Sequence, residues 1–410
     1  MIGVDIFKID RVEKLKQRKT FYKRFFTSNE YAFIEKKNFS NETIAGLIAA
    51  KEAVAKMFKT GISTRLGLLD IEILHDNAVP KINMENRKIK SLALAKGVQG
   101  LDISISHDGE YAIATCVSSN RGAIRVQKQM AKLLPKRDES FNKYDYGKVL
   151  IIGGKKGMSG SVRLAARAAM RTGAGMVYVY TPESIANVLA LSLVEPIIYM
   201  AKENNKGEFS DFDEKEFIEM IRRMDSIAIG PGMGSPESGK KMIELIFKNF
   251  EGPVVVDADG LNIISQEKDL LKLKKNVYIT PHHMEFSRLS NIPVKVIDEN
   301  REEKARAFLE EYNINLLLKG HETLVINKNN KYINPTGNSG MATAGSGDIL
   351  TGMLAALLAR VDNFDMLRLA AYIHGLCGDL AKIKYGEDSM VASDLIGQIP
   401  TIMKEMRDNE

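Results

Sequence analysis

The pattern of apolar and polar positions differs between the front of the chain and the rest. Beyond residue 142, short continuous apolar runs alternate with stretches in which apolar residues recur every three or four positions. Buried parallel strands give such runs, and helices that cover a sheet give the longer repeat. We therefore predict an α/β fold with a mostly parallel sheet and helices on both faces. The predicted strands are 148–152, 176–180, 227–229, 254–256, 277–279 and 316–318, and the predicted helices lie near 160–172, 236–249 and 302–312.

The first 118 residues predict an α+β domain instead. We expect a short strand at 2–7, an Ala-rich helix at 44–58, and strands at 70–74, 79–84, 101–106 and 111–117. The polar stretch 107–110 between the last two strands indicates a hairpin. A chain of 410 residues has room for two domains, which we place at 1–118 and 133–410, joined by a linker at 119–132.

Composition and charge indicate a cellular compartment for the protein and a class of binding partner. No apolar run reaches the roughly 20 residues that span a bilayer, and no signal-peptide pattern opens the chain. Cys116 and Cys377 are isolated, as expected for buried thiols in a reducing cytoplasm. Residues 1–118 carry a net charge of +5, whereas residues 142–410 carry −3. An acidic partner at the front is expected, with a basic surface kept for solubility as the alternative. No nucleic-acid or membrane partner is predicted.

Residues suited to chemistry follow the predicted parallel strands. Ligands bind at the carboxyl ends of such strands. The residues that directly follow the predicted strands of this chain are 153–154, 230–234, 257–260, 280–283 and 319–320. Nearly all of these residues are Gly, Asp, His or Lys. Adjacent His282 and His283 point apart and lack a third nearby ligand, so they do not indicate a metal site. His374, in an apolar helical stretch, is interpreted as structural.

The most distinctive stretch is 336–352, where glycines at 337, 340, 345 and 347 precede an apolar helical pattern. A Gly-rich turn that opens a helix directs free N–H groups to one place and suits an anion. Asp348 at the start of that helix has two interpretations. It complements the helix dipole, or it takes a proton from a hydroxyl beside a bound phosphate.

The front domain carries Asp5 on its first strand, Lys51-Glu52 with Lys56 four residues after Glu52 on its helix, and Ile-Ser-Ile-Ser-His at 103–107. In this combination it resembles holo-acyl-carrier-protein synthase, the phosphopantetheinyl transferase that loads the arm of coenzyme A onto a carrier-protein serine. It implies that Asp5 and Glu52 hold Mg²⁺ on the coenzyme A pyrophosphate, a ligand set that Mg²⁺ prefers. Glu52 and Lys56 are the implied catalytic residues.

The same resemblance implies contacts with coenzyme A and with acyl carrier protein at four residues: Arg11, Arg24, Lys56 and His107. Lys56 and His107 would bind phosphate, and the basic front helix would face the acidic carrier protein. The family usually has Arg-Phe where this chain has Leu47-Ile48. A module that only binds, or only trimerises, therefore remains an alternative. The family forms trimers, so a homo-oligomer is expected.

From about Leu133 to Pro400 the chain resembles the ADP- or ATP-dependent NAD(P)H-hydrate dehydratase, a repair enzyme with a ribokinase-like fold. The matching motifs keep the family order and lie at 146–154, 164–169, 173–175, 230–234, 257–262, 280–282, 318–320, 337–348 and 374–375. Two departures are local. His283-Met284-Glu285 replaces Pro-Gly-Glu, and Ser161 stands where Ala is usual.

This resemblance implies that ADP or ATP phosphorylates the ring hydroxyl of a hydrated nicotinamide cofactor, and that loss of phosphate restores NADH or NADPH. Such transfer depends on positioning and charge neutralisation. Asp348 is the implied base, assisted by the N–H groups of Gly345, Ser346 and Gly347. The implied contacts are Ser161, Gly232, His282 and Asp348 for the hydrated cofactor, and Lys319, Gly320, His321, Glu322, Thr323 and Gly347 for the nucleotide. A kinase for a stable small alcohol and a non-catalytic scaffold remain alternatives.

Overall fold

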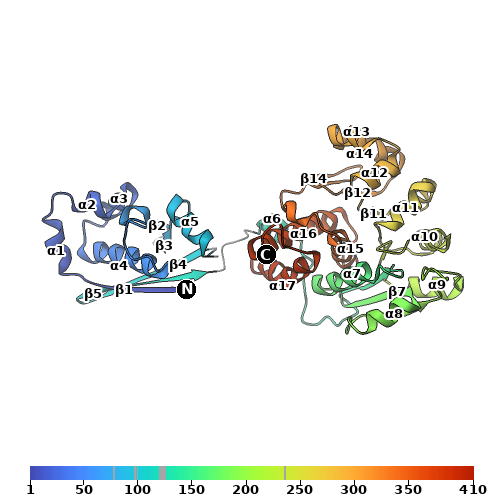
Figure 1. Ribbon diagram of the computed structural model, residues 1–410, viewed down its shortest axis with the longest axis horizontal. Coiled ribbons are helices and arrows are strands. Elements are labelled where there is room, and N and C mark those ends of the chain that lie inside the picture. Colours follow the sequence, from blue (N-terminus) through green and yellow to red (C-terminus); the bar gives the residue numbers. More distant parts are fainter. Residues whose placement is uncertain (77–78, 97, 99, 120–125, 235–236) are drawn as a thin grey trace. The chain divides into compact units, whose positions relative to one another are not determined.

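The computed structural model describes residues 1–410 except 77–78, 97, 99, 120–125 and 235–236. The chain forms two compact units, Met1–Arg125 and Val126–Glu410 (Figure 1). Residues 120–125 of the predicted linker lie outside the described part. A short helix, α6 (Lys128–Ala131), forms near the start of the second unit.

The first unit is built on one antiparallel sheet and one long helix. The sheet has the order β1-β5-β4, with β1 at Ile2–Lys8, β4 at Gly100–Asp108 and β5 at Tyr111–Ser119. Helix α4 (Asn41–Met57) starts at Ser40, whose side chain accepts a hydrogen bond from the N–H of Thr43. The helix lies against β1 because Gly3 has no side chain: a Cβ there would come 2.1 Å from the carbonyl oxygen of Ala53.

Shorter elements complete this unit. They are α1 (Arg11–Lys16), α2 (Phe21–Phe25), α3 (Ser28–Lys36), the 3₁₀ turn η1 (Leu68–Asp70), the β2–β3 hairpin (Ile73–Asp76 and Val79–Ile82) and α5 (Arg87–Ala95). A buried ion pair joins α3 to α4. The Nζ of Lys51 lies 2.7 Å from a carboxylate oxygen of Glu30 on α3, and both side chains are fully buried. Lys51 also donates to the carbonyls of Leu68 and Ile71.

The second unit contains a nine-stranded sheet with the order β14-β13-β12-β11-β10-β9-β6-β7-β8. The seven strands from β12 to β8 in that order are parallel, and β13 and β14 add an antiparallel edge. The strands are β6 (Lys148–Ile152), β7 (Met176–Pro182), β8 (Ile197–Ala201), β9 (Ser226–Ile229), β10 (Val254–Val256), β11 (Val277–Ile279), β12 (Asn315–Leu318), β13 (Leu324–Ile326) and β14 (Lys331–Ile333). The predicted fold class is confirmed for both units.

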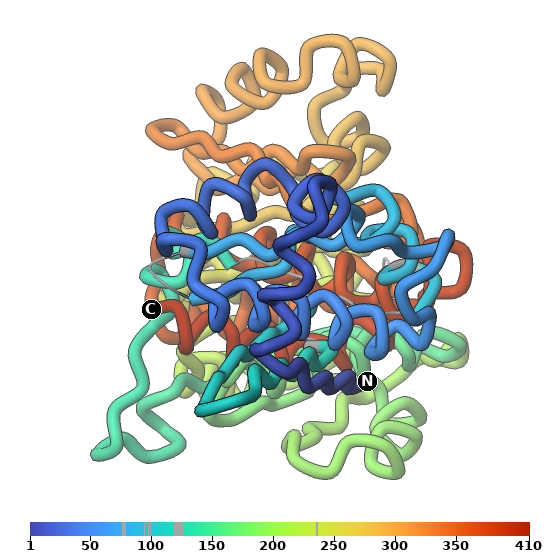
Figure 2. Tube along the Cα trace, turned by 90° about the vertical axis from the view of Figure 1, so that its left-hand side faces the viewer, coloured from blue at the N-terminus to red at the C-terminus, as the bar shows by residue number. Residues whose placement is uncertain are grey.

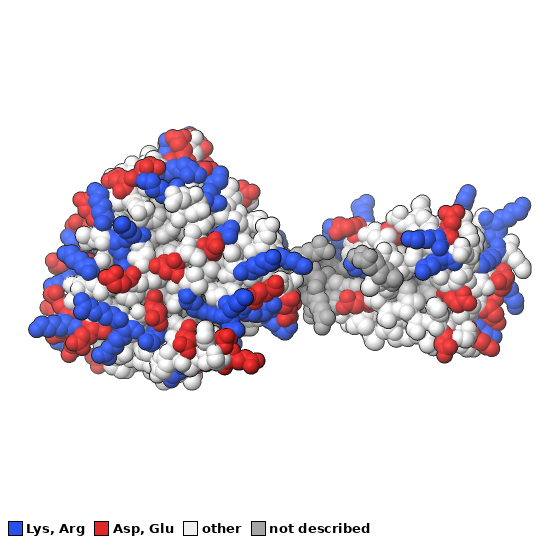
Figure 3. Space-filling model, turned by 180° about the vertical axis from the view of Figure 1, so that it is seen from behind, with Lys and Arg blue, Asp and Glu red and all other residues white. Residues whose placement is uncertain are grey.

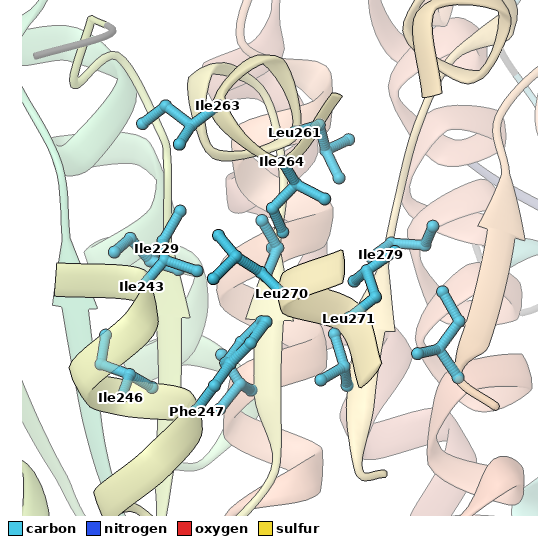
Figure 4. Packing of buried hydrophobic residues seen from close by; sticks show 14 of the residues in the cluster. Ile229, Ile243, Ile246, Phe247, Leu261, Ile263, Ile264, Leu270, Leu271 and Ile279 are labelled. Atoms are coloured by element: carbon cyan, nitrogen blue, oxygen red, sulfur yellow. The ribbon is translucent and has the colours of Figure 1, made fainter. Parts of the chain in front are cut away.

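Helices cover both faces of this sheet (Figure 1). One face carries α7 (Ser159–Thr172), α15 (Ser346–Leu358), α16 (Phe364–Tyr385) and α17 (Ala392–Asp408). The other carries α9 (Glu214–Arg222), α10 (Glu237–Asn249) and α11 (Asp259–Gln266), with α8 (Glu183–Ala190) beside β8. Figure 4 shows the apolar side chains of α10, α11 and η2 (Lys268–Leu273) interlocking with those of the central strands. Every residue of β9, β10 and β11 is buried, which explains their continuous apolar sequences.

Three further helices, α12 (His283–Ser290), α13 (Val294–Glu299) and α14 (Arg301–Glu311), lie beside the β12–β14 end of the sheet (Figures 1 and 2). On the surface seen in Figure 3, charges of both signs are interspersed on the second unit. No helix in the described part of the chain is both long and apolar enough to cross a membrane.

Candidate active sites

The Gly-rich stretch folds into a loop that opens α15 on the second unit. Gly345 is the N-cap and adopts φ 91°, a left-handed conformation that favours glycine. Ser346 N–H donates to the carbonyl of Thr343 at 3.3 Å. In the described part of the chain, the N–H groups of Gly345 and Gly347 have no hydrogen-bond acceptor. Two of the three predicted N–H donors are therefore free for an anion, and Ser346 N–H is already used within the loop.

Asp348 lies in the first turn of α15 and is half-buried. Burial, and then the negative charge of Asp257, raise the pKa of the Asp348 carboxyl to about 6, although a hydrogen bond from Ser161 and the charge of Lys319 oppose the shift. Its place in the first turn also suits an acidic residue that complements the helix dipole, but such a role does not require a raised pKa. A half-buried carboxyl that titrates near neutrality is suited to accept a proton.

Lys319 projects from the end of β12 into the same region. Its Nζ lies 2.9 Å from Oδ1 of Asp257 and 3.8 Å from Oε2 of Glu285. Burial alone would lower the pKa of Lys319, but the two carboxylates outweigh it and raise the pKa. The second oxygen of Asp257 accepts a hydrogen bond from Thr351 on α15 at 2.7 Å. Lys319 is therefore held as a charged group at the carboxyl end of the sheet.

A cavity of about 760 Å³ brings the predicted nucleotide residues together. Its lining includes the whole predicted set, Lys319, Gly320, His321, Glu322, Thr323 and Gly347, together with His282 and Ser346. One wall comes from the β12–β13 connection and another from the loop before α15. The cavity is large enough for a nucleotide, since small-molecule sites typically occupy about 300–1,000 Å³.

The predicted hydrated-cofactor residues gather next to Asp348. Ser161 near the start of α7 hydrogen-bonds the Asp348 carboxylate. Gly232, in the loop after β9, lies against Ser161, so that a Cβ on Gly232 would come 3.0 Å from the Cβ of Ser161. His282 is the N-cap residue of α12. An isolated parallel β-bridge pairs it with Lys319. Asp348 thus lies between the Ser161–Gly232 side and the nucleotide cavity.

Three polar residues of this site had no predicted role: Asp257, Glu285 and His374. Asp257 and Glu285 hold Lys319, and only the position of Asp257 directly after a predicted strand signalled it. His374, interpreted as structural, lines the cavity, and its Nε2–H donates to the carbonyl of Ser346 at 2.9 Å. Burial lowers the His374 pKa to about 4, so the ring stays neutral at physiological pH. The hydrogen bond from His374 fixes the backbone of the Gly-rich loop at Ser346.

The first unit brings Asp5, Glu52 and Lys56 together. The Nζ of Lys56 lies 2.7 Å from Oδ1 of Asp5 and donates to the carbonyl of Val4. Burial and the nearby Asp5 charge raise the pKa of Glu52. Two carboxylates that repel each other are a suitable pair for a divalent cation whose other ligands come from a phosphate or water. In the described residues, no group of three or more His, Cys, Asp or Glu side chains could hold a metal by itself.

His107, Arg11 and Arg24 lie apart from that pair. His107 lines a separate cavity of about 370 Å³ with Leu47, Glu42, Lys36 and Lys37. Leu47, which replaces the family arginine, is buried in this wall. Arg11 stacks its guanidinium over the ring of Phe7 at 4.9 Å, and both it and Arg24 are exposed. Of the four predicted coenzyme A and carrier residues, Lys56 pairs with Asp5, His107 lines a different cavity, and Arg11 and Arg24 are exposed.

Comparison with known proteins identifies a family for each unit of the chain. A family profile described as NAD(P)H-hydrate dehydratase covers residues 149–401. The chain belongs to the NAD(P)H-hydrate dehydratase family. A second profile, of the 4'-phosphopantetheinyl transferase superfamily, covers residues 1–116. Both resemblances inferred from the sequence are confirmed.

Relatives of this dehydratase family match the second unit. The bifunctional NAD(P)H-hydrate repair enzyme of Moorella thermoacetica is 35% identical over 278 residues, which are 67% of this chain and 52% of the relative. The ADP-dependent (S)-NAD(P)H-hydrate dehydratase of Staphylococcus aureus is 33% identical, covering 67% of this chain and 94% of the relative. The chain thus spans about half the length of the bifunctional relatives.

A solved dehydratase has the same fold. The ADP/ATP-dependent NAD(P)H-hydrate dehydratase of Bacillus subtilis, co-crystallised with ATP and Mg²⁺, aligns with a TM-score of 0.58 and 27% identity. The alignment covers 68% of this chain and 97% of that one. The dehydratase family membership therefore rests on sequence and on fold.

Proposed function

We propose that the second unit dehydrates NAD(P)H hydrate with ADP or ATP as phosphoryl donor. The observation that carries this proposal is the position of Asp348. A carboxyl with a pKa of about 6 accepts a hydrogen bond from Ser161, which packs against Gly232, and directly follows Ser346 and Gly347, which line the cavity together with Lys319. Family membership supports the same reaction.

The chemistry follows from these groups. The Asp348 carboxylate accepts the proton of the ring hydroxyl, whose oxygen then forms a bond to the terminal phosphorus of the nucleotide. The bond from that phosphorus to the bridging oxygen breaks, and AMP leaves when ADP is the donor, or ADP when ATP is the donor. The free N–H groups of Gly345 and Gly347 stabilise charge on the moving group. In the second step, the ring nitrogen supplies its electron pair, the C–O bond to phosphate breaks, and the nicotinamide ring of NADH or NADPH is restored.

The test is turnover of purified (6S)-NADH hydrate with ADP. Recovery of the NADH absorbance together with one phosphate released per NADH supports the proposal. A stable phosphorylated product without NADH would instead support a kinase for a small alcohol. No nucleotide-dependent change of any kind would support a scaffold.

We further propose that the first unit transfers 4'-phosphopantetheine from coenzyme A to a serine of acyl carrier protein. The adjacency of Asp5, Glu52 and Lys56 supports it. Asp5 and Glu52 would hold Mg²⁺, which supplies charge neutralisation on the pyrophosphate. Lys56 would bind phosphate, while Arg11 and Arg24 would face the carrier protein. His107 would also bind phosphate, and we expect the active form to be a homo-oligomer.

Mass spectrometry tests this second activity. Apo acyl carrier protein incubated with the full chain, coenzyme A and Mg²⁺ should gain the mass of one phosphopantetheine. An unchanged mass would favour a carrier-binding module in which the loss of the family arginine at Leu47 has ended catalysis.

A further inference from the structure

The loop that forms one wall of the cavity with Lys319 is held by two hydrogen bonds from one residue, Arg301. The guanidinium of Arg301 donates to the carbonyl of His321 at 2.8 Å and to that of Glu322 at 2.6 Å. Both carbonyls therefore point toward Arg301. Arg301 is the first residue of α14, so the loop conformation depends on where the start of that helix lies.

The same helical region is fixed by a histidine at the site where this chain departs from its family. His283 Nδ1–H donates to the carboxylate of Asp298 on α13, three residues before Arg301. A carboxylate only accepts, so the proton lies on Nδ1. This bond connects α12, which begins at His283, to the segment that carries Arg301.

The other nitrogen of His283 lies directly under the loop. Its Nε2 is buried and has no hydrogen-bond partner in the described part of the chain. A Cβ on Gly320 would come 2.7 Å from it. The imidazole thus supports the loop at Gly320 while its opposite edge holds Asp298. A proline, usual at this position, would supply neither contact.

We propose that His283, with Asp298, is a positioning residue for the nucleotide loop, residues 319–323. The dyad supports Gly320 from below and fixes the start of α14, and Arg301 then orients the carbonyls of His321 and Glu322. His283 does not line the cavity. It acts through the loop, so its loss weakens nucleotide binding and leaves the Asp348 chemistry in place. This inference rests on the proposed function for the identity of the nucleotide.

The test compares three variants of the full chain. His283→Pro removes the imidazole at the first helical position of α12, where proline is favoured. Asp298→Asn weakens the dyad from its other side. Glu299→Gln removes the same charge one residue further along α13, where no described residue pairs with it, and serves as the matched control.

Calorimetry with ADP and steady-state turnover are both measured. For His283→Pro and Asp298→Asn we expect a Kd and a KM for ADP that rise roughly tenfold, the usual effect of losing a charge-assisted hydrogen bond. The kcat and the KM for NADH hydrate stay within about twofold of wild type. Combining the two substitutions adds little to either alone, because both break one bond. Glu299→Gln matches wild type.

The outcomes separate this inference from the proposed function. Wild-type turnover with an unchanged Kd for ADP in both dyad variants would overturn the inference and leave the function standing. Equal weakening by Glu299→Gln would also overturn it, because the effect would then be one of net charge. If the wild type binds ADP but does not turn over NADH hydrate, the proposed function is overturned. If His283→Pro also weakens that ADP binding, the inference is still supported.

Discussion

The Nζ of Lys319 lies 2.9 Å from Oδ1 of Asp257, so the lysine of the nucleotide cavity is already neutralised before any phosphate arrives. Asp257 also raises the pKa of Asp348. One buried carboxylate therefore orients Lys319 and raises the pKa of Asp348, the proposed base.

Replacing the base should separate the two activities. Asp348→Asn is expected to lower NADH-hydrate repair by roughly 10²–10⁴-fold, the usual contribution of a general base. Transferase activity should be unchanged, because Asp5 and Glu52 belong to the other compact unit. Parallel assays of both reactions check this, with exposed Asp211→Asn as the control. An equal fall in both activities would contradict it.

The same substitution should stabilise the second unit. The folded pKa of Asp348, about 6, is above its ordinary 3.8, so the folded protein binds this proton more tightly than the unfolded chain. That contribution to stability is present below pH 4 and is lost as pH rises through 6. Asparagine is uncharged and has no cost of burying a charge. At pH 7 the unfolding temperature of the variant should therefore rise by about 2–4 °C for each kcal/mol of unfolding free energy gained. Calorimetry at pH 7 and pH 4 should show the gain only at the higher pH.

The pH profile of repair should depend on Asp257. In the wild type, kcat/KM for NADH hydrate should fall below an apparent pKa near 6, where Asp348 becomes protonated. Asp257→Asn removes the neighbouring negative charge and should move this acid limb to lower pH, while the overall rate falls because Lys319 loses its partner. Profiles of both proteins over pH 4.5–8 test the direction. A limb that stays in place would show that Asp257 does not act on Asp348.

The buried ion pair of the first unit gives a stability prediction. Lys51→Met leaves Glu30 charged and fully buried without its partner, at a cost of about 3–5 kcal/mol. Transferase activity should then be lost at a lower temperature than in the wild type, with dehydratase activity unaffected. Lys88→Met, which breaks a more exposed pair with Asp70, is the control. The double variant Lys51→Met/Glu30→Gln should recover part of the loss, since no charge stays buried.

Magnesium dependence should report on Asp5. Asp5→Asn removes one of two adjacent carboxylates, so half-maximal transferase activity should need roughly tenfold more Mg²⁺. Asp10→Asn, an exposed aspartate paired with Lys8, should need no more than wild type. Titration of Mg²⁺ at saturating coenzyme A distinguishes them. Identical curves for Asp5→Asn and wild type would remove Asp5 from the metal site.

The central strands were predictable because burial on both faces leaves an apolar sequence, as in β10, where every residue is buried. Strand β8 was not, because it is an edge strand in which Ile197, Tyr199 and Met200 face solvent and polar partners do not alternate with them. Strand β14 was not predicted either, because its three residues are partly exposed at the other edge of the sheet. Strand β13, which is as short and as buried as β10, was also missed.

Within the site, single residues with a position in a motif were predictable, and pairings between motifs were not. Asp348 and Lys319 each follow a recognisable sequence signal. The contact of His374 with Ser346 joins residues 28 positions apart, and that of Asp257 with Thr351 joins residues 94 apart. Such contacts depend on how α15 and α16 pack over the sheet, which no local pattern encodes.

The packing of α15 on α7 has a thermodynamic consequence. A Cβ on Gly352 would come 2.0 Å from the carbonyl oxygen of Ala165, and one on Gly345 would come 2.4 Å from Leu164. The two helices therefore pack backbone against backbone at Gly352, and the loop before α15 packs against α7 at Gly345. In the proposed reaction, N–H donors that are positioned when the chain folds would spare phosphoryl transfer the entropy loss of arranging them in each catalytic cycle.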